Sequence, residues 1–200
     1  ALCEQGRNFG NKIWNAYRLV NGWTADETAP QSENNRLAAQ WFRQVLGRTL
    51  REVADDFRSY RISEACTTVY RLFWDDFSAQ YLEMVKPAFG QPVDRRTLDE
   101  TRGFFDALMR MLHPYMPFIT EEIWQDLAPR AEGESICVAP MPEAEAADSA
   151  LLARFELVRE IVSAVRNIRN QKNLPQKELL TLQVIADDNY PAEYAPVLMK

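Results

Sequence analysis

Histidine is almost absent from this chain of 200 residues, in which His113 is the only one. Catalytic arrangements and metal sites that need two or more histidines are therefore excluded. His113 stands at the start of the segment HPYMPF (113–118), where two prolines predict a corner after a helix. We interpret His113 as a residue at a helix end, not as a catalytic base.

Cysteine is scarce as well, because the chain contains only Cys3, Cys66 and Cys137. Their odd number and wide separation do not form a disulfide framework, and they fit the reduced thiols of a cytoplasmic protein. Zinc sites often show closely spaced cysteine pairs such as CxxC, and no such pair occurs here. The sequence therefore predicts no metal site.

Phosphate-binding loops are also missing, since neither GxxxxGK[ST] nor GxGxxG occurs in the chain. The adjacent acids Asp75–Asp76 and Glu121–Glu122 point in different directions on a helix, so solvated faces or helix caps explain them better than acid–base catalysis. We expect no catalytic residue and no cofactor in this chain.

Long apolar runs are absent, and the N-terminus has no signal-peptide layout, so we expect no contact with a membrane. The hydrophobic content of 46% nevertheless suffices for one sizeable core. The chain starts at Ala1 without an initiator methionine, and we therefore expect it to be part of a longer protein.

Glycine is rare, at seven residues, and the apolar residues recur with helical spacing over most of the chain. The fold class predicted is mainly α, a helical bundle over residues 1–175 with a short strand insertion. Residues 176–200 are expected to start a small α/β connecting region that this chain does not complete. Phe73 and Phe77 are predicted to be buried.

Prolines, glycines and capping residues set the expected element boundaries. We expect six helices and two strands. The predicted helices cover about residues 4–21, a stretch through Phe42 and Phe57, a stretch from an N-cap at Ser63 to before Pro87, a stretch through Phe105 up to Pro114, residues 120–127 capped by Thr120, and residues 148–170. The predicted strands are 135–140 and 179–186. A loop at 23–32 is expected between the first and the second helix.

Charge is unevenly distributed along the chain, although the net charge is −6. Residues 121–148 contain eight acids and one base, a balance of −7. Residues 154–172 contain five bases and two acids, a balance of +3. A local surface for nucleic acid is therefore compatible with the acidic total.

The first predicted helix has a polar stripe that includes a tryptophan. At about 100° per residue, Arg7, Asn11, Trp14 and Arg18 fall on one narrow stripe, opposite the apolar residues Phe9, Ile13, Ala16 and Val20. Asn8 and Asn15 flank the stripe, and Lys12 lies farther round the helix. Arginine and asparagine can bind phosphate or base edges, and indole can stack on an unpaired base.

The sixth predicted helix has a second candidate face, on which Arg159, Arg166 and Asn170 align. Two interpretations stay open for both helices. The polar residues contact nucleic acid, or they serve the fold: Trp14 covers a groove, the asparagines bond to loop carbonyls, and the arginines lie over the core or pair with acids.

Four segments carry a family resemblance: CEQGRNFGNKIWNAYR (3–18), WDDFSAQYLEMVKP (74–87), LHPYMPFITEEIW (112–124) and VRNIRNQKNLP (165–175). Together and in this order they resemble the C-terminal half of valyl-tRNA synthetases, over nearly the whole chain. The third segment is similar in leucyl and isoleucyl synthetases, whereas the first and fourth point to the valyl enzymes.

The resemblance implies an α-helical anticodon-binding domain of a class I aminoacyl-tRNA synthetase. Its expected partners are the anticodon stem-loop of tRNA(Val) and the catalytic domain of the same polypeptide, in a monomeric enzyme that ligates valine to tRNA with ATP and Mg²⁺. The His-Ile-Gly-His and Lys-Met-Ser-Lys-Ser signatures of the family are absent, so we expect this chain alone to be inactive. The candidate tRNA-binding residues are Arg7, Asn8, Asn11, Lys12, Trp14, Asn15, Arg18, Arg159, Arg166 and Asn170.

Three alternatives remain at the level of the sequence. The chain is the corresponding domain of an isoleucyl or leucyl synthetase, a helical scaffold whose arginine-rich faces bind proteins, or a small enzyme whose site the motifs do not reveal.

Overall fold

The computed structural model describes residues 2–175, 178–185 and 190–199. The chain divides into two compact units, residues 1–147 and residues 148–200, and each is described here by itself. The sequence predicts a domain boundary near residue 175, after the last long helix. In the structure that helix, α7 (Ser149–Gln171), belongs to the second unit. The boundary at residue 175 stays a prediction.

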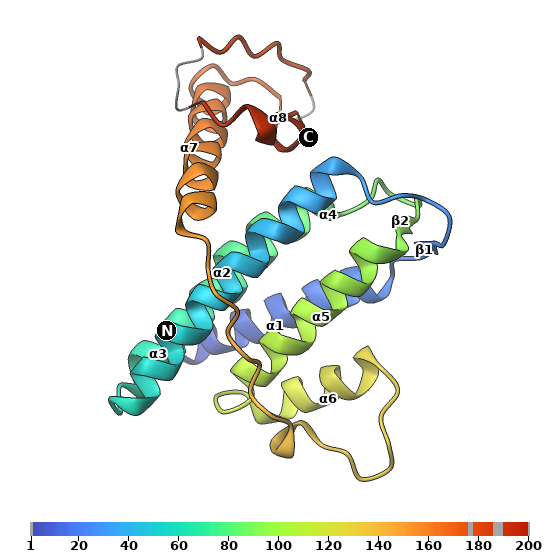
Figure 1. Cartoon of the computed structure of the whole chain (residues 1–200), viewed down its shortest axis with the longest axis vertical. Coiled ribbons are helices and arrows are strands. Elements are labelled where there is room, and N and C mark those ends of the chain that lie inside the picture. Colours follow the sequence, from blue (N-terminus) through green and yellow to red (C-terminus); the bar gives the residue numbers. More distant parts are fainter. Residues whose placement is uncertain (1, 176–177, 186–189, 200) are drawn as a thin grey trace. The chain divides into compact units, whose positions relative to one another are not determined.

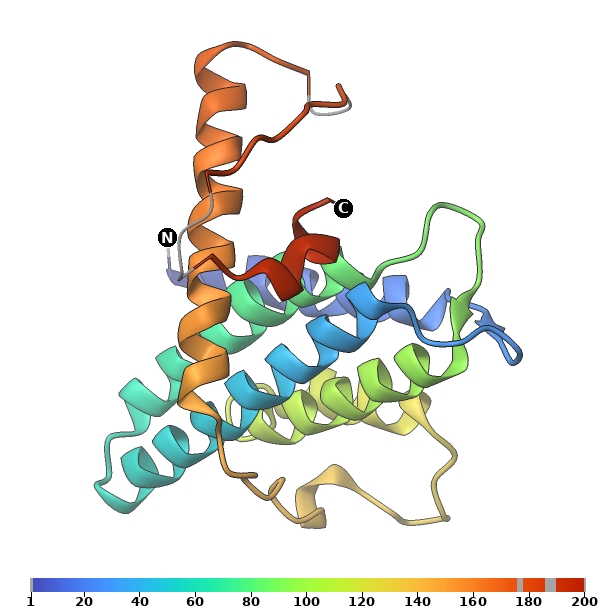
Figure 2. The ribbon, with the colours of Figure 1, turned by 45° about the horizontal axis from the view of Figure 1, so that its top comes forward.

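The first unit is a helical bundle, as the sequence predicts, and Figures 1 and 2 show its long helices α1, α2 and α5 side by side. A two-residue parallel ladder joins Ala25 to Val93 and Asp26 to Asp94, and its first strand lies in the segment 23–32 that is predicted to be a loop. The elements in chain order are α1 (Leu2–Asn21), β1 (Ala25–Asp26), α2 (Glu33–Arg58), α3 (Ile62–Arg71), the π-helical η1 (Leu72–Tyr81), α4 (Leu82–Val85), β2 (Val93–Asp94), α5 (Arg95–Leu112), α6 (Pro117–Leu127) and the 3₁₀ helix η2 (Ile136–Val138).

Aromatic rings from α2, η1 and α5 form the centre of this unit. The ring centroid of Phe42 lies 5.3 Å from that of Phe77, 5.2 Å from Tyr81 and 5.0 Å from Phe104. Phe73 and Phe77 are completely buried, which confirms the prediction for both. The Tyr81 hydroxyl lies 2.8 Å from the Thr101 hydroxyl, so this buried polar group has a partner.

Two predicted helix starts are wrong. Helix α3 begins at Ile62, one residue before the predicted cap Ser63. Helix α6 begins at Pro117 instead of after Thr120, because proline is well suited to the first helical position. The Thr120 hydroxyl is therefore inside the helix, where it donates to the Met116 carbonyl at 2.9 Å.

The predicted strand at 135–140 is also wrong, because Ile136–Val138 form a 3₁₀ turn. Ile136 is buried whereas Val138 is 83% exposed, so the segment lacks the two-residue alternation of a strand. A strand also needs a neighbour to accept its ladder, and none pairs with this segment among the described residues.

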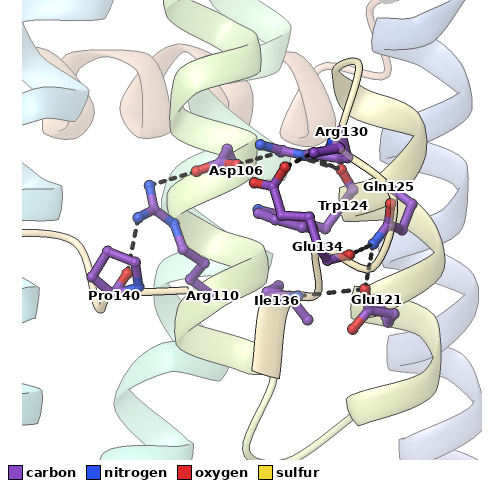
Figure 3. Close-up of polar contacts among 10 residues, drawn as sticks. Asp106, Arg110, Glu121, Trp124, Gln125, Arg130, Glu134, Ile136 and Pro140 are labelled. Atoms are coloured by element: carbon purple, nitrogen blue, oxygen red, sulfur yellow. Dashed lines mark hydrogen bonds and ion pairs between the residues drawn. The ribbon is translucent and has the colours of Figure 1, made fainter. Parts of the chain in front are cut away.

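Polar contacts attach residues 129–140 to α5 and α6 (Figure 3). The Arg130 guanidinium carbon lies 3.5 Å from the centroid of the Trp124 ring, and its Nη2 lies 2.9 Å from Asp106 Oδ1. Asp106 also pairs with Arg110 at 2.5 Å, and Arg110 donates to the Pro140 carbonyl at 2.9 Å. The segment is therefore fixed at both ends although it has little regular structure.

Glu121 on α6 holds the middle of the same segment. Its carboxylate accepts hydrogen bonds from Gln125, from the Ser135 hydroxyl at 2.7 Å and from the Ile136 backbone N–H at 3.4 Å. Desolvation raises the pKa of Glu121, but the hydrogen bonds from Gln125, Ser135 and Ile136 outweigh it and hold the pKa below its ordinary value.

The second unit contains α7 (Ser149–Gln171), the 3₁₀ helix η3 (Ala192–Tyr194) and α8 (Ala195–Leu198). Asp148 caps α7 by accepting from two backbone N–H groups, which agrees with the predicted start. Phe155 packs edge-on against Tyr194, with ring centroids 5.3 Å apart.

The strand predicted at 179–186 is wrong for residues 179–185, which have no regular secondary structure, while Ala186 lies outside the described residues. Leu179 and Ile185 are fully exposed, so the apolar residues here have no partner sheet in the described part of the chain. None of the described helices is both long and apolar enough to cross a membrane.

Two glycines in the middle of helices give a matched test of packing in the first unit. A Cβ added at Gly47 on α2 would lie 2.8 Å from the Glu145 carbonyl oxygen, whereas one at Gly103 on α5 would meet nothing within 4 Å. Gly103→Ala is expected to raise the free energy of unfolding by about 0.5–1 kcal/mol. Gly47→Ala is expected to lower it by about 1–2 kcal/mol, because overpacking against backbone exceeds the gain in helix propensity. Urea unfolding of both variants measures the difference, and equal effects would contradict the close approach.

Candidate nucleic-acid interface

Helix α1 has one face in the core and the opposite face exposed, as its sequence predicts. Phe9, Ile13, Ala16 and Val20 are all buried. The Phe9 ring packs on Phe73 of η1 with centroids 5.7 Å apart. Since α1 contacts α5, α6 and η1 on this side, the polar stripe faces away from the bundle.

The stripe and the two asparagines that flank it are exposed along three turns of α1. These exposed residues are Arg7, Asn8, Asn11, Trp14, Asn15 and Arg18. Within the described residues, neither Arg7 nor Arg18 forms an ion pair, in contrast to Arg61, which pairs with Asp56 at 2.7 Å. The two α1 guanidinium groups are therefore available to an external anion.

Trp14 is 40% exposed, which excludes complete burial of its indole within the described chain. Its ring packs against the buried Tyr17, with centroids 5.5 Å apart and planes inclined by 46°. Asn21 donates to the Tyr17 hydroxyl at 3.0 Å and so helps to fix that ring. An exposed indole supported from below is a suitable platform for a stacked base.

Tyr17 is a part of this site that the sequence prediction missed, because it lies on the buried side of the helical wheel. The signal that could have revealed it is the spacing of three residues from Trp14, since side chains at i and i+3 are neighbours on a helix.

Lys12 lies elsewhere than the stripe. Its ammonium nitrogen is 5.1 Å from the centroid of the Trp74 ring, a cation–π contact with η1, and the residue is half buried. Trp74 in turn stacks on Tyr70 with centroids 5.6 Å apart. Lys12 thus has a structural partner, which Arg7 and Arg18 lack in the described chain.

The α7 candidates belong to the second unit. Arg166 and Asn170 are exposed, whereas Arg159 pairs with Glu156 at 3.3 Å. Val158 is buried on the predicted core face, but Ile168 is 52% exposed, so that face is covered only in the first half of the helix. The seven α1 residues share one helix, and the three α7 residues form a separate group.

Arg169 is a cation that the sequence prediction left out. It donates from Nη1 to the Pro175 carbonyl and from Nη2 to the Glu178 carbonyl, both at 2.8 Å. These bonds give it a structural role at the end of α7.

Comparison with known proteins decides the family. Residues 39–185, more than half of the chain, match the family described as the anticodon-binding domain of tRNA ligase. This chain belongs to the anticodon-binding domain family of tRNA ligases. The match begins within α2 and extends past the end of α7, and α1 lies before it.

The relatives of this anticodon-binding domain confirm the resemblance to valyl enzymes. The chain is 60% identical over 189 residues to a valine–tRNA ligase of Parabacteroides distasonis, covering 94% of the chain and 22% of that protein. It is 54% identical over 200 residues to that of Phocaeicola vulgatus, covering 100% and 23%. It is 39% identical over 192 residues to that of Bacillus licheniformis, covering 90% and 21%.

The chain thus spans about a fifth of the length of these relatives. The second alignment covers the whole chain and therefore includes α1, which the family match does not.

Proposed function

We propose that this chain is the part of a valine–tRNA ligase that binds the anticodon stem-loop of tRNA(Val), and that the exposed stripe of α1 contacts the RNA. Trp14 stacks on an unpaired base, and Arg7 and Arg18 bind phosphates or base edges. Asn8, Asn11 and Asn15 offer amide groups that pair with base edges.

The observation that carries this proposal is the combination of an exposed, supported indole with two arginines that have no ion-pair partner in the described chain. Helix α1 contains Glu4 as its one acid against Arg7, Lys12 and Arg18, so it is locally basic within an acidic chain. Arg159, Arg166 and Asn170 form a secondary candidate contact, in which Arg159 would have to leave Glu156.

The activity of the whole protein is part of the proposal. The relatives are named as valine–tRNA ligases, and we propose that the protein containing this chain ligates valine to tRNA with ATP and Mg²⁺ in the cytoplasm. In this proposal a catalytic domain of the same polypeptide supplies the nucleotide chemistry, and the enzyme acts as a monomer. The chain described here contributes tRNA binding.

The test is the affinity of the chain for the tRNA(Val) anticodon stem-loop at two salt concentrations. Trp14→Ala is expected to weaken binding by about 5- to 150-fold at both, which corresponds to the loss of one stacked base. Arg18→Ala is expected to weaken binding and also to flatten the salt slope by about one, because one phosphate contact is lost. Fluorescence anisotropy with labelled RNA measures both effects.

Three controls make this result specific. Trp14→Phe retains a stacking ring and should recover most of the affinity. Arg48→Ala makes the same change of charge on an exposed position of α2 and should leave the salt slope unchanged. A stem-loop with altered anticodon bases should bind the parent chain more weakly. Unchanged affinity of both folded α1 variants would remove this face from the RNA site and leave α7 as the candidate.

A second candidate function is supported by Leu19, which is 40% exposed beside the stripe. In this alternative, α1 packs against another part of the same ligase. Trp14→Ala would then leave the affinity of the chain for the stem-loop unchanged. It would instead weaken the contact between α1 and the rest of the ligase and so lower the melting temperature of the full-length enzyme. Melting curves of the chain and of the full-length enzyme separate the two functions.

A further inference from the structure

Three side chains with metal-binding chemistry meet where α5, α6 and η2 come together. His113 is the cap residue directly after α5, Glu121 lies in the second turn of α6, and Cys137 is the middle residue of η2. A ring nitrogen of His113, a carboxylate oxygen of Glu121 and the Cys137 sulfur all lie within 4.8 Å of one another. His113 and Glu121 are 8 positions apart in the sequence, and Glu121 and Cys137 are 16 apart. The site contains one cysteine only, so a search for closely spaced cysteine pairs does not reveal it.

The hydrogen bonds of Thr120 determine which nitrogen of His113 carries the proton. The Thr120 hydroxyl donates its one proton to the carbonyls of Met116 and Pro117. It must therefore accept from His113 Nδ1, which lies 2.8 Å away. The neutral ring then has its proton on Nδ1 and a free lone pair on Nε2.

That lone pair points to Cys137, because His113 Nε2 lies 3.1 Å from the Cys137 sulfur. Histidines that bind metals usually donate their other N–H to a neighbouring acceptor, which fixes the ring and the tautomer. The Thr120 hydroxyl provides this support here. His113 Nε2 and the Cys137 sulfur thus converge at 3.1 Å, and both atoms have lone pairs that could bind one metal ion.

Glu121 is the third side chain of the cluster, and its hydrogen bonds fix its position. Its two oxygens accept from Gln125, Ser135 and Ile136, and these bonds orient the carboxylate towards the segment that contains Cys137. Figure 3 shows the bonds from Gln125 and Ile136. Oε1 already accepts from Gln125 and Ile136, whereas Oε2 accepts only from Ser135 and has capacity for a further contact.

We propose that His113, Glu121 and Cys137 bind one zinc ion, with water as the fourth ligand. Thiolate, imidazole and carboxylate are the ligands zinc prefers, and tetrahedral sites with bonds of about 2.0–2.3 Å place ligand atoms about 3.3–3.8 Å apart. The separations in the structure, 3.1 Å between His113 and Cys137 and at most 4.8 Å within the cluster, need shifts on the order of 1 Å to reach this geometry.

Binding exchanges a proton for the metal. The Cys137 S–H bond breaks, its proton leaves to solvent, and the sulfur forms a bond to zinc, while His113 keeps its proton on Nδ1. No oxidation takes place. The ion would join η2, which lies within the segment that Arg130 and Arg110 anchor, to the corner between α5 and α6.

Zinc and cobalt titrations of the 200-residue chain, after treatment with a chelator, test this site. Calorimetry should give one zinc per chain, and zinc at a hundred times its Kd should raise the melting temperature by about 5–10 °C. Cobalt should give the near-ultraviolet band of a thiolate–cobalt bond. Cys137→Ser and Glu121→Gln should remove the tight binding, whereas Cys3→Ser and Cys66→Ser should leave it intact.

Thr120 is a positioning residue in this proposal. Thr120→Val should weaken zinc binding by about 10- to 100-fold, and Thr120→Ser should restore it. The cobalt spectrum separates this effect from a simple loss of stability. Absence of stoichiometric binding, or binding that persists in Cys137→Ser, would overturn the proposal. Rapid alkylation of Cys137 that zinc does not slow would also overturn it and identify the pair as a reactive thiol.

Discussion

Replacing Phe77 with alanine is expected to lower the free energy of unfolding by about 3–5 kcal/mol, and Phe73→Ala by a similar amount. Both side chains are completely buried, so each truncation loses apolar transfer energy and leaves a cavity that the surrounding rings fill only in part. Phe77 also contacts Phe42 and Phe105, each with ring centroids 5.3 Å away. Urea denaturation followed by circular dichroism measures the loss.

Phe118 provides the matched control for this prediction, because its side chain is 90% exposed at the start of α6. Phe118→Ala makes the same chemical change and should alter stability by less than about 0.5 kcal/mol. A loss below about 1 kcal/mol at both Phe73 and Phe77 would show that the core has been assigned to the wrong face of η1.

The helical elements could be predicted because their apolar residues repeat with a local period. The faces of α1 and the burial of Phe73 and Phe77 follow from spacing and hydrophobicity alone. Helix starts were less certain where two signals compete. At α6, the preference of Pro117 for the first helical position prevailed over the capping tendency of Thr120.

The predicted strands failed because strand formation depends on a partner outside the segment. Residues 135–140 contain apolar residues between turn formers, but their backbone turns at Ile136 and their neighbours are side chains of α6. The one ladder of the described chain joins residues 25–26 to 93–94, too short to leave a pattern in the sequence.

The two candidate sites differ in how far the sequence reveals them. The α1 stripe is a property of one helix, so its members could be identified from the wheel, and the structure adds Tyr17 as the support of Trp14. The cluster of His113, Glu121 and Cys137 depends on the packing of three elements and on the turn at η2. No periodicity along the chain encodes that convergence.

Asp94→Ala is expected to have the second largest effect on stability, a loss of about 2–4 kcal/mol. Asp94 is buried at the start of α5, where Oδ1 accepts from the Thr97 backbone N–H at 2.8 Å as the helix cap. Its Oδ2 accepts from the side-chain amide of Asn35 on α2 at 3.2 Å. Truncation therefore removes a cap and also leaves a buried amide N–H without this partner.

The two contributions can be separated by a double-mutant cycle with Asn35→Ala. In the Asn35→Ala background no buried amide remains to be left unpaired, so Asp94→Ala should cost only the cap, about 0.5–2 kcal/mol. Asp94→Asn should keep the cap through its amide oxygen and should lose less than Asp94→Ala in the parent chain. Equal losses from Asp94→Ala in both backgrounds would show that the contact between Asp94 and Asn35 contributes nothing, and that the start of α5 depends on its cap alone.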